Sequence, residues 1–107
     1  MSVSVFRMNP EDDSFEIGFE MPISREEFFT KFWQPAIEEL QISGIQNGIE
    51  LRKEQLESTL LELEKLRIWA QSNLKNNDLE YMVARIDLLI KELPLAFKTD
   101  DTILWIG

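Results

Sequence analysis

The fold of this chain is decided by residues 49–70, which read IELRKEQLESTLLELEKLRIWA. Apolar side chains recur there at intervals of three, four and seven residues, and charged side chains fill most of the positions between them. The recurring apolar residues are Ile49, Leu56, Leu60, Leu63, Leu66 and Ala70. This spacing places them on one stripe and predicts a long amphipathic helix that ends near Ser72.

Four further apolar residues of this helix lie outside the stripe. Leu61 and Ile68 fall on one side of it, and Leu51 and Trp69 fall on the other. In the arrangement that we favour, neighbouring helices of the same domain cover both flanks, because a layer of three helices would use them. In the alternative, the flank with Leu61 and Ile68 contacts a second subunit or a target.

The N-terminal region has the pattern of a β-hairpin. Apolar residues between positions 3 and 8 are followed by a polar turn at residues 9–13 and by strict alternation from residue 15 to residue 21. The core-facing set of the second strand is Phe15, Ile17, Phe19 and Met21. Because side chains alternate between the two faces of a strand, Glu16 and Glu20 are expected on the opposite, wet and acidic face.

The next helix is predicted to begin at Ser24, because Ser24 and Glu27 have the spacing of a capping box. Its apolar face consists of Phe28, Phe29, Phe32, Trp33, Ala36, Ile37 and Leu40. We interpret this aromatic face as core rather than as a ligand pocket. Pro35 lacks the amide that a continuous helix needs, so we expect a kink or a second short helix that begins at Pro35.

The last helix follows a connection of about four residues, which makes it antiparallel to the helix before it. Asn77 and Glu80 resemble another capping box, and Pro94 should end or kink the helix. Its apolar face consists of Leu79, Met82, Val83, Ile86, Leu89, Ile90 and Leu93. Residues 42–48, which precede the first long helix, contain two glycines and are expected to form turns.

Residues 102–106, Thr-Ile-Leu-Trp-Ile, are too short for a helix and rich in strand formers, which predicts a final strand, with burial on both faces or a central place in the sheet. We therefore expect a single α+β domain over residues 1–107. In it, the N-terminal hairpin and the C-terminal strand form a small antiparallel or mixed sheet. Three or four helices, including one long central helix, pack on one side of that sheet.

Composition disfavours several classes of function. The net charge of −9 disfavours binding to nucleic acid or to an anionic membrane surface. The chain has no cysteine and no histidine, which removes thiolate sites and the commonest catalytic base. No segment approaches the roughly 20 apolar residues of a membrane span, and the start does not resemble a signal peptide. We expect a soluble, cytoplasmic protein.

The remaining polar residues do not form the pattern of a catalytic or metal site. Glu11, Asp12, Asp13 and Glu16 lack the alternating acids and the central glycine of a calcium loop. Tyr81 and the serines have no histidine to activate them. The sequence therefore predicts no metal, no cofactor and no enzyme activity.

Acidic residues are concentrated in the first part of the chain. Residues 1–40 hold nine acids and three bases, whereas residues 41–73 hold five acids and four bases. Such a field would steer a basic protein toward this surface, and the alternative is a solvated face that aids solubility. The candidate contact residues for a basic partner are Glu11, Asp12, Asp13, Glu16, Glu20, Glu27 and Glu38.

The C-terminal third resembles the ends of small bacterial immunity proteins. The resemblance lies in LEYMVARIDLLIK at residues 79–91 and in DTILWIG at residues 101–107. Immunity proteins of this kind are cytoplasmic and neutralise the toxin domains of polymorphic toxin systems by binding them. The resemblance implies a non-enzymatic protein that binds a toxin domain, which the acidity suggests is basic. The alternative is a self-associating structural or adaptor domain whose homodimer forms through Leu61 and Ile68.

Overall fold

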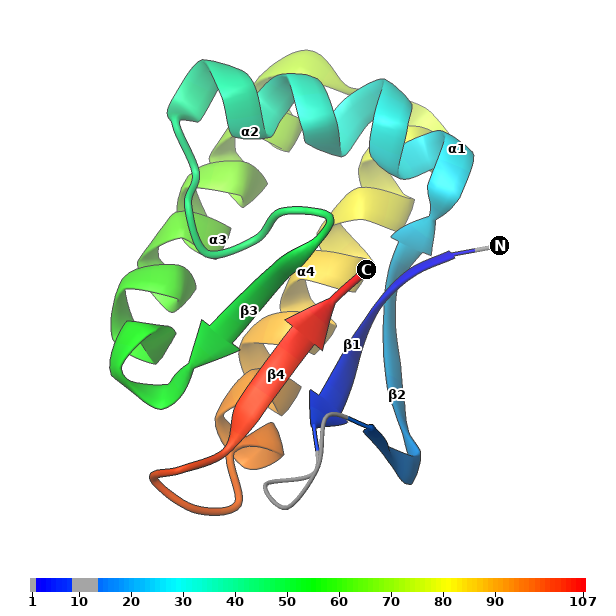
Figure 1. The fold of residues 1–107 in the computed structure, drawn as a ribbon. Helices are drawn as coiled ribbons and strands as arrows, with labels where there is room; N and C mark the ends of the chain where they lie inside the picture. Colours follow the sequence, from blue (N-terminus) through cyan, green and yellow to red (C-terminus); the bar gives the residue numbers. More distant parts are fainter. Residues whose placement is uncertain (1, 9–13) are drawn as a thin grey trace.

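The computed structural model of the chain describes residues 2–8 and 14–107 (Figure 1). In this part of the chain, four strands form one antiparallel sheet in the order β2-β1-β4-β3. The strands are β1 (Ser2–Met8), β2 (Phe15–Arg25), β3 (Ile49–Arg52) and β4 (Ile103–Ile106). The predicted hairpin and final strand are confirmed, and β4 holds a central position between β1 and β3.

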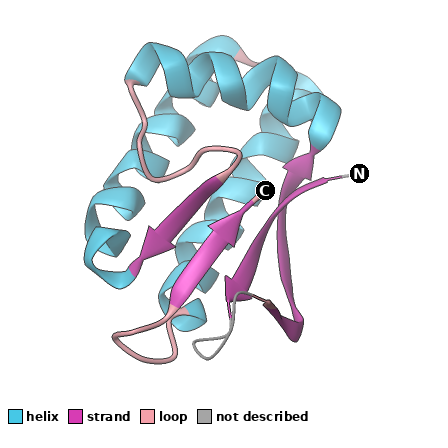
Figure 2. Cartoon of the chain, viewed as in Figure 1, coloured by secondary structure: helices cyan, strands magenta, loops and turns pink. Residues whose placement is uncertain are grey.

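The helices lie on one side of this sheet, which gives the predicted α+β fold (Figure 2). Helices α3 (Leu56–Asn73) and α4 (Asn76–Ala96) pack against each other behind the sheet. A rod made of α1 (Glu26–Phe28), a π turn (Phe29–Trp33) and α2 (Gln34–Leu40) runs across the top. The open side of the sheet faces the viewer in both figures.

One hydrophobic core lies between the sheet and the helices. The predicted apolar faces of the rod, of α3 and of α4 all contribute to this core. The interpretation of the aromatic face of the rod as core is therefore confirmed. Helical side chains with no exposed surface include Trp33, Leu63, Leu66, Met82, Ile86 and Leu89. Burial of each such side chain stabilises the fold by about 1.5–3 kcal/mol before the entropy of ordering is counted.

The first residues of the predicted long helix form strand β3 instead. Ile49 and Leu51 lie opposite Ile106 and Leu104 of β4, and Leu51 is fully buried there. Helical geometry starts only with a 3₁₀ turn at Lys53–Gln55. Pairing with β4 outweighs the local helical spacing, because the cross-strand pairs bury apolar surface in the core. The helix prediction was therefore wrong for residues 49–52 and is confirmed for the stripe from Leu56 onward.

The rod begins two residues later than the predicted start at Ser24. Ser24 belongs to β2, where it pairs with Val3, and its hydroxyl donates to the carbonyl of Arg25 rather than accepting from the helix. The rod starts at Glu26 without a side-chain cap. The predicted capping box was wrong because sheet pairing with β1 extends β2 to Arg25.

Helix α4 covers the end of β2. The amide of Arg25 donates to the hydroxyl of Tyr81 at 3.1 Å, and Nε of Arg85 donates to the carbonyl of Ile23 at 3.1 Å. Nη2 of Arg85 also donates to the carbonyl of Pro22. These bonds supply partners to edge-strand backbone groups that would otherwise need water or another chain.

Pro35 has the predicted effect on the rod. It has no amide to donate to the carbonyl of Lys31, so the usual hydrogen bond of that turn is missing. The turn before it widens, and the amide of Gln34 donates to the carbonyl of Phe29, five residues back. A second α-helical segment then begins at Gln34, one residue before the predicted start.

The ends of α4 differ in detail from the prediction. The helix begins at Asn76 without a side-chain cap, so the predicted cap at Asn77 was wrong. Only residues 74 and 75 separate it from α3, fewer than the four predicted. Pro94 does not end the helix, which continues to Ala96. These shifts leave the predicted pair of adjacent helices intact.

The predicted alternation along β2 is broken by a change of register. Phe6 lies opposite Glu20, but Met8, two residues later, lies opposite Phe15 rather than opposite residue 18. β2 therefore has three more residues than β1 between these two pairs. Because an offset of one residue turns a side chain to the other face of the sheet, an offset of three reverses the facing of β2. Phe15 stacks on Phe6 and Glu16 faces the other way, so the predicted facing was wrong for these two residues.

Candidate functional site

The side of the sheet that the helices leave open carries a row of two acids and two aromatic residues. Glu20 of β2 lies opposite Phe6 of β1. Phe6 also lies opposite Trp105 of β4, which lies opposite Glu50 of β3. Directly paired residues point to the same face, so the row crosses all four strands. With neighbouring strands about 4.8 Å apart, the ends of the row are about 14 Å from each other.

The strand neighbours of this row fix its direction. Val5 and Leu104, which precede Phe6 and Trp105, are fully buried in the core. Since successive side chains of a strand point to opposite faces, Phe6 and Trp105 point away from the helices. Both aromatic residues are partly exposed, and the acids at both ends of the row are exposed.

A second row of the open face is mainly apolar. Met8 lies opposite Phe15, and Ile103 lies opposite Arg52. Phe15 is 44% exposed, and its ring stacks on that of Phe6 with centroids 5.0 Å apart. The apolar residues of the two rows form a strip between the acids. We call this set the aromatic strip: Phe6, Met8, Phe15, Ile103 and Trp105.

The two acids at the ends of the row have different neighbours. Oε2 of Glu20 accepts a hydrogen bond from Oγ of Ser4 at 2.9 Å, and Glu20 forms no ion pair with any described residue. Oε2 of Glu50 lies 3.4 Å from Nη2 of Arg52, and both of these side chains are about half exposed. The Glu20 end is therefore the more strongly negative of the two.

The indole of Trp105 lies against backbone that the sheet holds in place. The amides and carbonyls of Gly107 and Ser4 form two mutual hydrogen bonds of 3.0 Å, which extend the pairing of β4 with β1. A Cβ added to Gly107 would lie 2.5 Å from Nε1 of Trp105. The ring can take this position only because residue 107 has no side chain, so the aromatic strip is preformed at this end.

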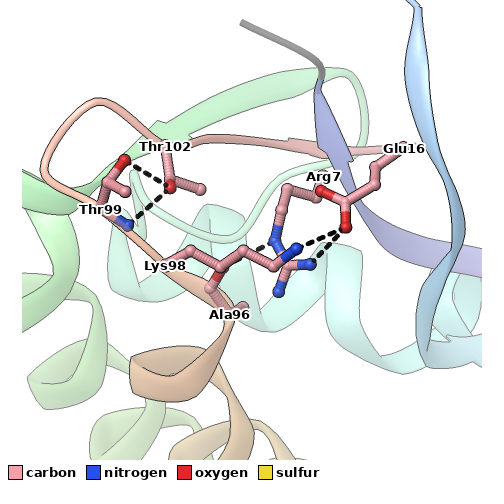
Figure 3. Close-up of polar contacts among 6 residues, drawn as sticks. All are labelled: Arg7, Glu16, Ala96, Lys98, Thr99 and Thr102. Carbon is pink, nitrogen blue, oxygen red and sulfur yellow. Dashed lines mark hydrogen bonds and ion pairs between the residues drawn. The ribbon is translucent and has the colours of Figure 1, made fainter.

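Glu16, one of the predicted contact acids, is engaged inside the protein. Its Oε1 accepts from Nη1 of Arg7 at 3.1 Å and from Nζ of Lys98 at 2.7 Å (Figure 3). Arg7 is nearly buried, and its Nε donates to the carbonyl of Ala96 at 2.9 Å. Its guanidinium also lies 4.0 Å from the ring centroid of Phe19. The cluster fastens the hairpin to the end of α4, which makes Glu16 a structural residue.

The ionisation of Glu16 should affect stability. The hydrogen bond from Lys98 lowers the pKa of the carboxyl below its ordinary value of 4.5, with a further contribution from Arg7, while partial burial opposes both. A carboxyl with a lowered pKa in the folded state contributes stability above its unfolded pKa and loses it as the pH falls through the folded value. Glu16→Gln should therefore unfold at a lower temperature than wild type near neutral pH, and this gap should close in acid.

Thermal unfolding followed by circular dichroism over a series of pH values measures this gap. Glu80→Gln, at an exposed position of α4 without an ion pair to any described residue, is the matched control and should change little at any pH. A gap for Glu16→Gln that stays constant down to strong acid would mean that the carboxylate charge is not its source.

The other predicted contact acids do not belong to the open face. Glu11, Asp12 and Asp13 lie outside the described residues. Glu27 and Glu38 are exposed on the rod, eleven residues and therefore about 16 Å apart along it. Among the predicted acids that the structure describes, Glu20 alone lies in the row with Phe6 and Trp105.

An open hollow lies beside the start of the rod. Its lining consists of Arg25, Glu26, Glu27, Phe28, Thr30, Lys31, Phe32 and Asp78. The lining contains three acids and two bases, and Nζ of Lys31 lies 5.2 Å from the ring centroid of Phe32. This mixture of charges gives the hollow no preference for a ligand of either sign.

The two flanks of α3 are not equivalent. Nε1 of Trp69 donates to Glu39 of α2 at 2.5 Å, so the rod covers that flank as expected. Leu61 and Ile68 are 63% and 62% exposed, so the expectation that neighbouring helices cover them was wrong. They lie seven residues apart and face the same side of the helix. Leu51, the fourth flank residue, is buried in β3.

Three residues of the row, namely Phe6, Trp105 and Glu50, were not among the predicted contact residues. The continuous apolar run at residues 102–106 allowed burial on both faces, which concealed the outward position of Trp105. Glu50 lies in the stretch whose spacing predicts a helix. The Asn-Gly pair at residues 47–48, followed by the alternation Ile-Glu-Leu-Arg, is the signal that would have identified β3.

The described residues contain no group of three or more His, Cys, Asp and Glu side chains arranged to hold a metal ion. No helix in this part of the chain is long and apolar enough to cross a membrane. No family model, no curated protein and no solved structure matches the chain. The open face of the sheet is therefore the feature of this chain that bears most directly on its function.

Proposed function

We propose that this chain is a non-enzymatic protein-binding domain, an immunity protein that neutralises a basic bacterial toxin domain by binding it directly in the cytoplasm. The resemblance of residues 79–91 and 101–107 to immunity proteins supports the class. The open face of the sheet is the docking surface. Neither a cofactor nor nucleic acid nor a membrane takes part.

The observation that carries this proposal is an uncovered sheet face with an apolar centre and acidic ends. Protein interfaces typically have an aromatic-rich centre inside a polar rim, and the aromatic strip between Glu20 and Glu50 has this composition. The net charge of −9 favours a partner of opposite charge and would accelerate encounter with it. A basic protein is therefore the partner that this face fits.

The strands that carry the aromatic strip also suit a docking surface. Phe6 and Trp105 come from the two central strands, whose other faces are fixed in the core by Val5 and Leu104. The backbone of such strands moves little on binding, so less conformational entropy is lost when a partner docks.

Co-expression with the toxin domain encoded by the neighbouring gene tests the function. We expect the chain to restore growth of cells that produce the toxin and to form a complex with it that survives gel filtration. Growth arrest that is the same with and without this chain, together with the absence of any complex, would contradict the proposal.

The exposure of Leu61 and Ile68 supports a second candidate, a self-associating structural or adaptor domain. In a two-fold antiparallel contact between α3 helices, Leu61 of each copy would meet Ile68 of the other. This contact would form a homodimer without using the open face.

Light scattering over a range of concentrations tests this second candidate. Self-association predicts a dimer that Leu61→Glu or Ile68→Glu dissociates, because either change buries an unpaired charge in the contact. Leu95→Glu, at a position of α4 that is 68% exposed, is the matched control and should leave the dimer intact. A monomer at every concentration would eliminate this candidate.

A further inference from the structure

The pairing of an acid with an aromatic residue on the open face points to a partner group of defined chemistry. We propose that this face binds an arginine side chain of the partner, with the guanidinium stacked on the ring of Phe6 and hydrogen-bonded to Glu20. The inference rests on the proposed function, since it names the group that the docking surface recognises.

The geometry of Glu20 and Phe6 suits a guanidinium better than an ammonium group. The two residues lie directly opposite each other on neighbouring strands, so their Cβ atoms are about 5 Å apart. A guanidinium is planar, is weakly hydrated, and can stack on a ring while its edge donates to a carboxylate. An ammonium group is compact and strongly hydrated, so it loses more on leaving water.

The same two strands hold an arginine in this way on their other face. Arg7 of β1 lies 4.0 Å from the ring centroid of Phe19 of β2 and donates to Glu16 of β2 at 3.1 Å. Ring, carboxylate and guanidinium are thus already combined within this hairpin. The outward-facing pair of Phe6 and Glu20 offers the ring and the carboxylate, and the ion pairs of the described residues place no guanidinium at Glu20.

The opposite end of the row is less available, because the chain supplies its own arginine there. Nη2 of Arg52 lies 3.4 Å from Glu50, beside Trp105. At the Glu20 end, Ser4 donates to Oε2 alone, which leaves Oε1 able to accept from a partner. The partner arginine therefore belongs at Glu20, and Arg52 takes the equivalent place at Glu50.

The experiment uses capped peptides of sequence Gly-Arg-Gly-Arg-Gly and Gly-Lys-Gly-Lys-Gly as probes. Each is titrated at low salt into the isotope-labelled chain, and amide shifts are followed by NMR. We expect the arginine peptide to shift the amides of Phe6, Phe15 and Glu20 and to bind at least about fivefold more tightly than the lysine peptide. Glu20→Gln should weaken arginine binding by about tenfold, because a charge-assisted hydrogen bond is lost.

The matched control is Glu57→Gln, which removes one exposed acid from α3 on the other side of the sheet and should leave arginine binding unchanged. Equal binding of the two peptides, no shift at the open face, or full affinity in Glu20→Gln would each overturn the arginine inference. None of these results bears on growth rescue. Failure of the rescue and of complex formation would instead contradict the proposed function itself, so the two failures are distinguishable.

Discussion

Replacing Leu66 by alanine is expected to lower the free energy of unfolding by about 2–5 kcal/mol. Leu66 lies on the core-facing stripe of α3 and has no exposed surface. Its truncation removes buried methyl groups and leaves a cavity that the surrounding helices and sheet can fill only in part. Because a domain of this size has a total stability of about 5–15 kcal/mol, the loss is a large share of it. Urea unfolding followed by circular dichroism measures the change.

The control for this prediction is the same substitution five residues earlier. Leu61→Ala removes the same atoms from the same helix, but Leu61 is 63% exposed, so we expect a change within about 0.5 kcal/mol. Leucine and alanine both favour helices, so helix propensity contributes little to either result. Similar losses for the two variants would mean that α3 does not present Leu66 to the core and Leu61 to solvent.

Periodicity predicted the long elements of this fold because many residues share in the signal. The stripe of α3 from Leu56 to Ala70 and the apolar face of α4 each recur over several turns, and both are confirmed. The four residues of β3 are too few to separate a strand from the start of a helix by spacing alone. Their structure is decided by pairing with β4, some 50 residues later in the chain.

The candidate site was predicted only in part for a related reason. The basic partner that net charge favours stays a prediction, and Glu20 was among the predicted contact residues. The register shift in β2 separated Glu16 from Glu20, and the alternation of the sequence gives no sign of that shift. Phe6 and Trp105 meet across about 100 residues of chain, so no local pattern brings them together. Site residues that are brought together by strand order can be identified only when the pairing of the strands is known.

Replacing Phe6 by alanine is expected to weaken the proposed complex with a toxin domain by about 30-fold or more, the typical effect of removing an aromatic hot-spot residue. Phe6 is the centre of the aromatic strip, because it lies opposite Glu20 and Trp105 and stacks on Phe15. Its loss removes the ring on which a partner group would stack and leaves the neighbouring rings without support. Isothermal titration calorimetry with the toxin domain measures the dissociation constant.

Leu95→Ala separates this effect from a general loss of exposed apolar surface. Leu95 is 68% exposed near the end of α4 and is not part of the aromatic strip, so its truncation should leave the affinity unchanged. Phe6 is only partly buried, so Phe6→Ala should remain folded, which thermal unfolding of the free protein checks. A folded Phe6→Ala that binds the toxin domain with wild-type affinity would mean that the complex forms elsewhere. The exposed flank of α3 with Leu61 and Ile68 would then be the next surface to test, because both side chains are more than half exposed on one side of the helix.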